Sequence, residues 1–458
     1  MEEKMINLKV VTKPEEGRPF LDYRFQAKEE KEISIVKEGN RYIYTTPMEK
    51  LKDTDVMNLC AKGVKIFKNA QINTFALSLE KFAVLPLVYT IQGIYLGLYE
   101  VENYKTDRQE KCWDIELCGL DGNYSEIVQQ VKEAEEIAKG VIFARNLVNA
   151  PSNHLTPEKM AETIQNLFED LPVEVEIFDE NQIKELGMEA FLAVGMTSGY
   201  MPRLIVVRYH GNPKTEEVTA FVGKGVTCDT GGYCLKSAAS LPGVKGDNGG
   251  AAAVTGALYA LVKNQVKKNV TVVIPSCENR ISRDAFIPGD VIGSMSKKTI
   301  EVGNTDAEGR LILADAVTYA IEKEKATRIV DIATLTGAVA SMFGGVAAGT
   351  LSNDDDFYKE FEQAFENSGE KYWRLPIYDE FKEMLNSDMA DISNTSGGCG
   401  TITAGLFIQA FTKELPWIHI DIAGTAWTGG PRYEYESKGA TGAGVTTLYY
   451  LMRENMEK

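Results

Sequence analysis

Charged or glycine-rich segments follow predicted strands at three places in the sequence. In open α/β sheets, ligands bind beyond the carboxyl ends of the strands, so these segments are the first candidates for a functional site. The first segment follows residues 218–222 and contains Lys224, Asp229, Lys236 and Asp247. The second, GNTDAEGR at residues 303–310, holds Asp306, Glu308 and Arg310 just before a predicted helix. The third, ATLTG at residues 333–337, includes Thr334 and Gly337.

The four carboxylates of these segments could balance the charge of two divalent cations if the fold brings the segments together. Buried side by side without cations, carboxylates repel one another and take up protons, whereas metal ions hold them ionised. An isolated Asp-x-Glu pair is more often part of a solvated loop. The interpretation as a metal site therefore depends on convergence of the segments.

Histidine-based chemistry is not expected. The three histidines, His154, His210 and His419, form no HExxH pattern, so a zinc site built on imidazoles is improbable and any metal must rely on oxygen ligands. No GxSxG elbow or nucleophile–histidine pattern indicates a serine or cysteine triad. We expect each histidine to have a structural role.

Alternating strands and helices must position the charged segments. After Pro172, apolar runs predict strands at residues 173–178, 204–207, 218–222, 270–274, 329–332 and 417–422. Helical patterns lie between them at residues 181–191, 250–262 and 310–323. This order predicts an α/β fold with a mixed, largely parallel sheet that helices cover on both faces.

A length of 458 residues favours two domains. Residues 1–123 are predicted to form a smaller N-terminal α/β domain, with strands at residues 75–79 and 88–99. Apolar residues then recur at helical spacing, which predicts a linker helix within residues 124–150, capped by Ser125 and ending before Asn149. A second helix is expected to start near Thr156. Residues 151–458 are predicted to form the larger domain, which carries the charged segments.

Composition and charge exclude several classes of partner. The net charge is −17 and no basic segment could follow a phosphate backbone, so nucleic acid is not an expected partner. The start, MEEKMINLKVV, lacks the apolar core of a secretory signal, and we expect a cytoplasmic protein. Polar residues, Gly93 and Pro86 interrupt the apolar run at 82–99, which predicts a buried strand region rather than a membrane span. The seven cysteines, with no CxxC pair, are expected to be free thiols in a reducing compartment.

Two motifs carry a resemblance to a known family. The segments VGKGVTCDTGGYCLK at residues 222–236 and NTDAEGRL at residues 304–311 resemble the two signatures of the leucyl aminopeptidase family of metallopeptidases. Asp229, Lys236, Asp247 and Asp306 follow Lys224 by 5, 12, 23 and 82 residues, as in that family. The similarity extends through ARNLVNAPSNHLTPEKM, CENRISRDAFIPGDV, IATLTG and HIDIAGTAW, from about residue 124 to the end, and weakly into the first domain through GLYEVENYK.

The resemblance implies a catalytic metallopeptidase domain that removes the N-terminal residue of short peptides. One metal would be held by Lys224, Asp229, Asp247 and Glu308, and the other by Asp229, Asp306 and Glu308. A neutral amine is required for Lys224 to act as a ligand, and a hydroxide bridging the two metals would be the nucleophile. The catalytic side chains would be Lys236, which stabilises the oxyanion, and Arg310, which holds a bicarbonate ion as a proton relay.

Further implications concern substrate, metals and assembly. The substrate-binding residues would be Lys236, Asp247, Leu241, Val244, Thr334 and Gly337, with the peptide's amino terminus at one metal and Asp247. The metals would be zinc or manganese, with magnesium and cobalt as alternatives, because oxygen ligands accept all of these ions. Family members form hexamers, which implies a homohexamer here.

The sequence departs from the family pattern near the proposed ligands. Cys228 and Cys234 stand where the family usually has Phe and Ser, and Leu241 and Val244 stand where methionines usually line the pocket. Asn248 and Ser237 replace a usual methionine and proline. No ligand is lost, but the preference for the first residue of the substrate is left open. The two cysteines could confer sensitivity to oxidation or simply pack in the core.

Two alternatives belong to other functional classes. A two-metal phosphoesterase could use the same paired metals with Arg and Lys. A non-enzymatic assembly protein on the same fold would explain the motifs without catalysis. The presence of all seven expected polar residues disfavours an inactive protein, and turnover of aminoacyl-anilides but not aryl phosphates would exclude the phosphoesterase.

Overall fold

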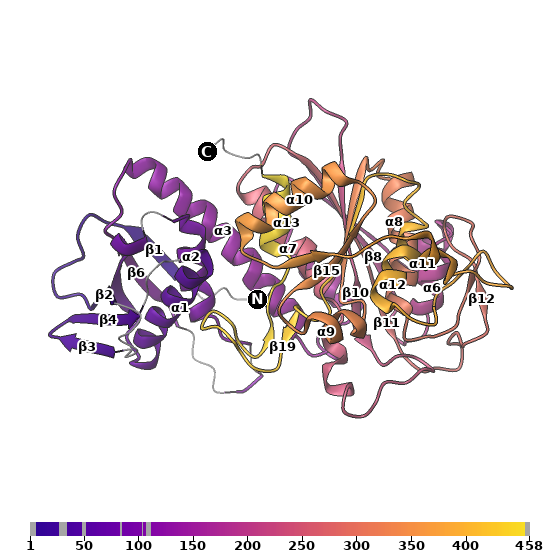
Figure 1. Cartoon of the computed structure of the whole chain (residues 1–458), viewed down its shortest axis with the longest axis horizontal. Coiled ribbons are helices and arrows are strands. Elements are labelled where there is room, and N and C mark those ends of the chain that lie inside the picture. The colour runs from indigo at the N-terminus through magenta and orange to yellow at the C-terminus, as the bar shows by residue number, and fades with distance from the viewer. Residues whose placement is uncertain are drawn as a thin grey trace. The chain divides into compact units, whose positions relative to one another are not determined.

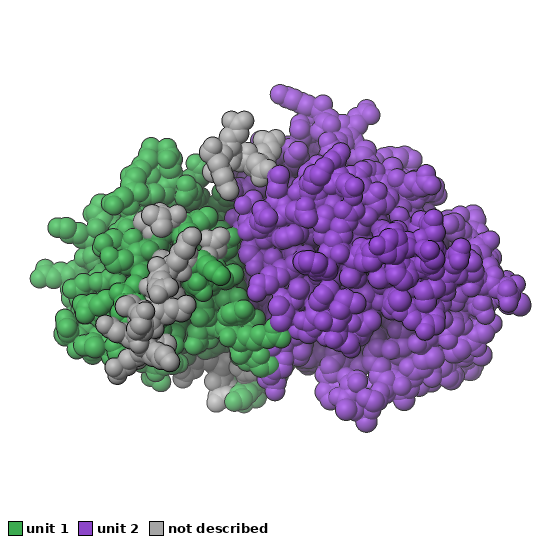
Figure 2. Space-filling view, viewed as in Figure 1, with its two compact units in different colours: residues 1–139, 430–437 green, residues 140–429, 438–458 purple. Residues whose placement is uncertain are grey.

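Two α/β units, each built on its own sheet, make up the chain. The structure is a computed structural model and describes residues 6–26, 34–47, 52–82, 85–102, 104–106 and 111–453. The first unit comprises residues 1–139 and 430–437, and the second comprises residues 140–429 and 438–458 (Figure 2). The smaller N-terminal and larger C-terminal α/β parts predicted from the sequence are confirmed, whereas the boundaries at residues 123 and 150 stay a prediction.

The first unit contains a mixed six-stranded sheet in the order β1-β6-β5-β2-β4-β3. Only the pairing of β3 with β4 is antiparallel. The strands are β1 (Ile6–Val10), β2 (Phe20–Gln26), β3 (Ser34–Glu38), β4 (Arg41–Pro47), β5 (Thr74–Ser78) and β6 (Trp113–Cys118). The helical elements are α1 (Asp53–Asn69), a 3-10 turn (Glu80–Phe82) and α2 (Leu87–Leu98).

The strand predicted at residues 88–99 is wrong, because this segment is helix α2. All twelve of its residues are buried, so its sequence shows no amphipathic period that would separate a buried helix from a buried strand. Gly93 and Gly97 let α2 approach α1 closely. A Cβ on Gly93 would lie 2.4 Å from Met57 O, and a Cβ on Gly97 would lie 2.7 Å from Ala61 Cα. Among the described residues, no helix has the length and apolarity needed to cross a bilayer.

Helix α3 (Tyr124–Asn149) is the predicted linker helix, and it extends to Asn149 itself. The predicted cap at Ser125 is wrong, because Ser125 lies inside the helix. Asn123 takes that role, with its Oδ1 accepting a hydrogen bond of 3.0 Å from Ser125 N. The next helix, α4 (Pro157–Phe168), begins as predicted, and the Thr156 side chain accepts from Lys159 N.

The second unit is organised around a nine-stranded mixed sheet. Eight strands follow the order β16-β15-β18-β14-β9-β11-β8-β7, and β10 pairs in parallel with β11. The central strands β18, β14, β9 and β11 are parallel, and β15, β8 and β7 introduce the antiparallel pairings. This arrangement confirms the prediction of a mixed, largely parallel sheet. The strands are β7 (Glu174–Phe178), β8 (Arg203–His210), β9 (Thr219–Gly223), β10 (Gly225–Asp229), β11 (Asn269–Asn279), β14 (Arg328–Ala333), β15 (Ala348–Ser352), β16 (Tyr372–Arg374) and β18 (Trp417–Asp421).

Helices cover both faces of this sheet (Figure 1). In that view α7, α10 and α13 lie on one side of the strands, and α6, α8 and α12 on the other. The helices are α5 (Glu180–Glu185), α6 (Glu189–Gly195), α7 (Gly249–Lys263), α8 (Glu308–Glu322), α9 (Gly337–Phe343), α10 (Asp355–Ser368), α11 (Asp379–Glu383), α12 (Gly400–Gln409) and α13 (Val445–Met452). Smaller elements are a 3-10 segment (Leu241–Gly246), a three-stranded sheet of β12 (Val291–Ile292), β13 (Ile300–Glu301) and β17 (Ile392–Ser393), and the pair β19 (Trp427–Thr428) and β20 (Gly439–Ala440).

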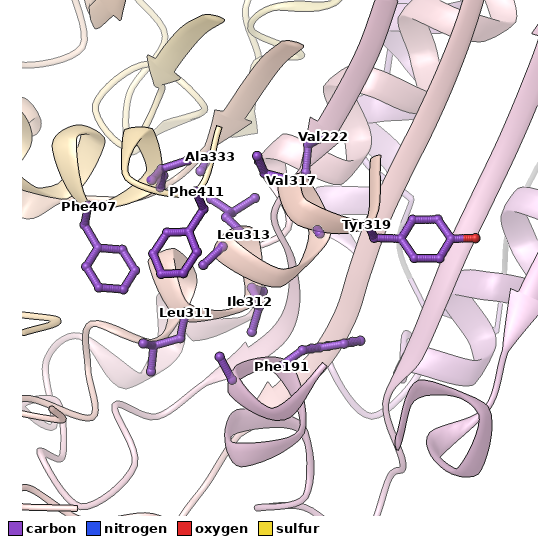
Figure 3. Close-up of a cluster of buried hydrophobic side chains, with 14 of the residues drawn as sticks. Phe191, Val222, Leu311, Ile312, Leu313, Val317, Tyr319, Ala333, Phe407 and Phe411 are labelled. Carbon is purple, nitrogen blue, oxygen red and sulfur yellow. The ribbon is translucent and has the colours of Figure 1, made fainter. Parts of the chain in front are cut away.

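Helix α8 is the centre of the larger hydrophobic core. Its residues from Glu308 to Ala320 are all buried, and Leu311, Ile312, Leu313 and Val317 pack with side chains of neighbouring elements (Figure 3). A helix buried all round has a fixed axial position and rotation, because any shift would open cavities in a close-packed interior. The first turn of α8 is therefore a rigid support for the side chains that it carries.

One predicted helix is split in the structure. The segment predicted as a single helix at residues 181–191 forms α5 and α6, which are separated at Gly187 with φ +73°. A positive φ is easy for glycine but ends a right-handed helix. The other strands and helices predicted after Pro172 are present, with ends shifted by a few residues.

The contact between the start of α7 and the sheet yields a stability prediction. A Cβ on Gly250 would lie 2.0 Å from Ile332 O and 2.6 Å from Lys224 N, so Gly250→Ala must push α7 away from β9 and β14. We expect a loss of about 1–3 kcal/mol of unfolding free energy, measured by urea denaturation. Gly199→Ala is the matched control, because nothing lies within 4 Å of its Cβ. Equal stability of the two variants would contradict this packing.

Candidate metal centre

The first charged segment starts at the carboxyl end of β9 and runs through β10. Lys224 follows the last residue of β9, and Asp229 is the last residue of β10. Both pair in parallel with β11 in succession, with Val222 opposite Val273 and Asp229 opposite Asn279, so β10 continues the line of β9 beyond Lys224. Asp247 comes just before α7, and Glu308 is the first residue of α8. Parallel strand ends and two helix starts therefore direct the four side chains to one place.

Ion pairs connect the residues that were predicted to converge. Lys224 Nζ lies 2.7 Å from Asp247 Oδ2 and 2.8 Å from Glu308 Oε1. Lys236 Nζ lies 2.6 Å from Asp229 Oδ2 and also contacts Asp306. The four carboxylates and two lysines thus form one charged cluster from segments that are up to 84 residues apart, from Lys224 to Glu308.

Three of the carboxylates are arranged as metal ligands could be. One oxygen each of Asp229, Asp306 and Glu308 lies within 4.8 Å of the others. Both carboxylate oxygens of Glu308 are buried without a hydrogen bond, and Oε1 has only its ion-pair contact with Lys224. Burial of a carboxylate without hydrogen bonds destabilises the fold unless a cation replaces the missing hydrogen bonds. The donor set, rich in carboxylate oxygen, fits a divalent cation such as manganese or magnesium, and also zinc.

Burial and crowding of like charges change the protonation of this cluster in the absence of cations. Burial, together with the charge of Asp229, raises the pKa of Glu308 to about 8. Burial raises the pKa of Asp247 to about 6 against the opposing effect of Lys224. Burial disfavours the charged form of Lys224, but Asp247 and Glu308 outweigh it and raise the pKa of this lysine. Without metal, the two lysines therefore remain ammonium ions and partly neutralise the carboxylates.

Arg310 lies two residues beyond Glu308 on α8 and is almost fully buried. Its Nη1 donates a 2.8 Å hydrogen bond to Asn394 O, while its Nε has no hydrogen-bond partner. Burial lowers the pKa of Arg310 to about 10, which leaves the guanidinium charged near neutral pH. A buried cation with an unused donor is suited to bind an anion.

A cavity of about 590 Å³ surrounds the cluster. All the predicted metal ligands and catalytic residues line it, together with Val244, Thr334 and Gly337. Leu241 is not among the lining residues and is 36% exposed, so its proposed contact with substrate stays a prediction without support from the cavity. None of the three histidines lines the cavity, and His419 is instead buried against Asp331 at 2.6 Å.

Several lining residues were not singled out from the sequence. They come from later parts of the chain and include Thr336, Ala338, Thr395, Ser396, Gly400, Thr403, Ala423 and Trp427. For Thr395, Ser396 and Gly400 the sequence signal is the run SNTSGGCG at residues 393–400, which is typical of a loop, whereas Thr336 lies in the segment ATLTG, and Ala423 and Trp427 lie in HIDIAGTAW. Which face of the domain such a loop lines depends on the fold and not on its composition.

Buried polar side chains fasten the ligand-bearing loops to each other. Asn279, at the end of β11, donates hydrogen bonds to Asp229 Oδ1 at 2.9 Å and to Thr305 O at 3.0 Å. Thr305 in turn donates to Gly231 O at 2.7 Å. The loop after β10 and the loop before α8 are therefore held in a fixed relation without help from a cation.

The loop after β14 is anchored in the same way. Asp421 at the end of β18 accepts hydrogen bonds from Leu335 N and from Thr336 Oγ1, at 3.1 and 2.5 Å. Thr334 Oγ1 donates to Asp247 Oδ1 at 2.8 Å, and Lys224 Nζ donates to Thr334 O at 3.0 Å. The third segment predicted from the sequence thus contacts the first one directly.

The cysteines form no disulfide bond. Cys228 is buried and Cys234 is half-buried, and neither lines the cavity. The backbone N–H of Cys234 donates to Thr305 Oγ1 at 2.8 Å. Cys234 therefore helps to join the two loops through its backbone, which a serine at the same position would also do.

Comparison with known proteins decides the family. A model described as "Cytosol aminopeptidase family, catalytic domain" matches residues 142–449. The chain belongs to the cytosol aminopeptidase family. The family resemblance inferred from the two motifs is thereby confirmed, and the chain is an aminopeptidase, a hydrolase of peptide bonds. Family membership also decides against the phosphoesterase and the non-enzymatic alternatives.

Individual relatives support the same assignment. The chain is 44% identical over 400 residues to a probable cytosol aminopeptidase of Clostridium perfringens (strain 13 / Type A), which covers 85% of this chain and 81% of that protein. It is 43% identical over 418 residues to a probable cytosol aminopeptidase of Alkaliphilus oremlandii (strain OhILAs), with 89% and 83% coverage. Among solved structures, the bottromycin maturation enzyme BotP in complex with Mn superposes with a TM-score of 0.85 at 27% identity, over 95% of this chain and 99% of that chain.

The raised pKa of Glu308 predicts how stability depends on pH in metal-free protein. The pKa of the Glu308 carboxyl rises on folding from 4.5 to about 8. Its contribution to stability is therefore complete below a pH of 4.5 and is lost as the pH rises to about 8. Metal-free protein should therefore lose stability between about pH 5 and about pH 9, while metal-loaded protein should lose less because the cation replaces the proton.

Thermal unfolding with and without Mn²⁺ across this pH range measures the effect. Glu308→Gln is the control, because it keeps the shape of the side chain but cannot titrate. The decline should be shallower in this variant, and the increase in melting temperature on adding Mn²⁺ should be smaller. Both proteins should be compared without metal over the same pH range. If the wild-type protein loses no more stability than Glu308→Gln, the assigned pKa shift is contradicted.

Proposed function

We propose that the aminopeptidase removes the first residue of short peptides with two divalent metal ions bound in this cavity. Lys224, Asp229, Asp247 and Glu308 would hold one ion, and Asp229, Asp306 and Glu308 the other. The observation that carries the proposal is the pair of buried Glu308 oxygens, which have no hydrogen bond and lie beside the carboxylates of Asp229 and Asp306. Zinc or manganese are the proposed ions, with magnesium and cobalt as alternatives. Support for manganese comes from the relative crystallised with Mn.

The bound cations would supply a hydroxide at neutral pH and polarise the scissile carbonyl. For this chain, the proposal requires Lys224 to lose its proton when it becomes a ligand, because only the neutral amine has a free electron pair. In the metal-free protein Asp247 and Glu308 favour its ammonium form. Metal binding should therefore release one proton from Lys224 in addition to those from the carboxyl groups.

Lys236 is the proposed oxyanion donor. Its side chain is 24% exposed, whereas that of Lys224 is 3% exposed, so Lys236 is the more accessible of the two lysines to a substrate in the cavity. The carboxylates around it, Asp229 first among them, outweigh burial and raise its pKa, which keeps the ammonium charged. A fixed positive charge at this place would stabilise negative charge on the substrate carbonyl oxygen.

Arg310 is the proposed anion-binding residue. Its unused Nε donor and its position on the cavity wall support binding of a bicarbonate ion, which would supply a proton relay to the leaving amine. Asp247 would receive the peptide's amino terminus. The hydrogen bond from Thr334 to Asp247 supports a role for Thr334 in the substrate pocket. Val244 and Gly337 would line the pocket for the first side chain, and Leu241 is proposed only from the family resemblance.

Assembly and location are also proposals. A homohexamer is supported by the resemblance to a family whose members form hexamers, and light scattering coupled to size-exclusion chromatography would measure it. A cytoplasmic location is supported by relatives that carry the name cytosol aminopeptidase.

Substitution of Lys236 tests the proposed catalytic role. We expect Lys236→Ala to lower kcat about 10²–10³-fold on aminoacyl-anilides, since one oxyanion donor contributes about 3–4 kcal/mol. Affinity for Mn²⁺, measured by calorimetry, should change far less, because Lys236 is not a proposed ligand. Glu308→Ala should instead abolish both metal binding and turnover. Aminoacyl-anilides, dipeptides and an aryl phosphate should be assayed on metal-stripped protein refilled with Zn²⁺, Mn²⁺, Mg²⁺ or Co²⁺.

The outcomes distinguish the mechanism from its alternatives. Unchanged kcat in Lys236→Ala would remove this residue from the mechanism. Faster turnover of the aryl phosphate than of the anilides would show that the metal centre hydrolyses phosphoesters rather than peptide bonds. Lys236→Arg is a useful companion variant, because it keeps the positive charge but replaces the compact ammonium with a larger, planar guanidinium. It should recover a small part of the lost activity.

A further inference from the structure

One buried amide holds the loop that presents two of the carboxylates. Asn394 follows β17 and is fully buried. Its Oδ1 accepts hydrogen bonds from Gly303 N at 2.8 Å and from Asn304 N at 3.3 Å. Its Nδ2 donates to Asn304 O at 2.8 Å and to Ala307 O at 3.4 Å. Two acceptor sites and two donor hydrogens are the full capacity of a carboxamide, so all of it is used on this loop.

The backbone of the same residue is fixed on both sides. Asn394 N donates to Glu301 O at 2.9 Å, which continues the parallel pairing of β13 with β17. Asn394 O accepts the 2.8 Å hydrogen bond from Arg310 Nη1. One residue therefore contacts both the loop before α8 and the guanidinium on α8.

The loop needs such support because its backbone is irregular and partly buried, with Thr305 buried and Gly303 exposed. Residues 303–307 lie between β13 and α8 without pairing to a strand. Within this stretch the short-range bonds are those from Ala307 N to Asn304 O at 3.2 Å and from Asp306 N to Asn304 Oδ1 at 2.8 Å. Buried backbone groups require partners, and the Asn394 side chain supplies four of them. Its removal would free the turn that sets the direction of Asp306 and Glu308.

We propose that Asn394 is a positioning residue for the metal centre, which orients Asp306 and Glu308 through the loop at residues 303–307 and orients Arg310 through its own carbonyl. The inference rests on the proposed function, because it presupposes that Asp306 and Glu308 bind metal. It assigns to Asn394 no contact with metal or substrate. Asn394 would hold the ligands in the geometry that binds metal. Without it, the loop would have to be ordered when metal binds, at a cost in conformational entropy.

Asn394→Asp is the principal variant. It keeps the size of the side chain and the Oδ1 acceptor, but places an oxygen against Asn304 O and Ala307 O where the amide donates. Asn394→Ser is the second variant, in case the aspartate prevents folding, and it retains a single hydroxyl for these partners. Circular dichroism and thermal unfolding establish that each protein is folded before metal is added.

Asn269 offers a matched control in the same unit. It too is buried and uses its amide on a distant loop, accepting from Asn212 N at 3.0 Å and donating to Asn212 O at 2.9 Å, Thr215 O at 3.0 Å and Glu217 O at 3.2 Å. It stands at the start of β11 and does not line the cavity. Asn269→Asp and Asn269→Ser should cost similar stability without touching the metal centre.

Titration of metal-stripped protein with Mn²⁺, followed by calorimetry and by the electron paramagnetic resonance spectrum of the bound ion, separates the two roles. We expect the apparent Kd for Mn²⁺ to rise about 10–100-fold in the Asn394 variants, with an altered spectrum, and to stay within about twofold in the Asn269 variants. At saturating Mn²⁺ the Asn394 variants should still have a lower kcat, because loss of the side-chain bonds would let the Asn394 backbone shift, and its carbonyl accepts from Arg310 Nη1.

The result that overturns this inference differs from the result that overturns the proposed function. If wild-type protein binds Mn²⁺ and Glu308→Gln does not, but the Asn394 variants bind it as wild type does, the positioning role is wrong and the metal centre stands. Equal weakening by the Asn394 and Asn269 variants also overturns it, since general destabilisation would then explain the loss. If wild-type protein itself binds no Mn²⁺, the proposed function fails first.

Discussion

Repulsion among four crowded carboxylates is the constraint on which the larger unit depends. Asp229, Asp247, Asp306 and Glu308 are brought within reach of two lysines, and the raised pKa of Glu308 and of Asp247 reflects first their burial and then this crowding. In the unfolded chain these carboxylates would be far apart and hydrated. The rest of the unit must therefore stabilise an arrangement that is electrostatically unfavourable until cations arrive.

The fold meets this constraint with rigid supports and favourable dipoles. Helix α8 is buried on all sides, and α7 packs so closely on the sheet that Gly250 has no room for a Cβ. Both helices begin at the cluster, and the positive end of a helix dipole stabilises nearby carboxylates. Because these elements cannot shift without opening cavities, the carboxylates cannot relax away from one another.

The sequence predicted those parts of the site whose information is local. Apolar runs predicted the strands that precede Lys224 and Thr334, and the motifs placed polar residues directly after those strands, where an open α/β sheet binds ligands. The segment at residues 88–99 was predicted wrongly, since a uniformly apolar run carries no period that separates helix from strand. The cavity wall from Thr395 to Thr403 could not be predicted either, because its place depends on how β17 pairs with β13.

Asn394 illustrates the same limit at the level of a single residue. In the sequence it is an ordinary asparagine in a polar run, and its chemistry matches many asparagines that cap turns. Its importance arises only after β17 pairs with β13 and sets its amide against the loop before α8. Chemical groups that bind metal can be recognised from residue type and spacing, whereas groups that hold the ligands in place are defined by tertiary contacts. The precision of a metal centre therefore depends on residues that a motif does not contain.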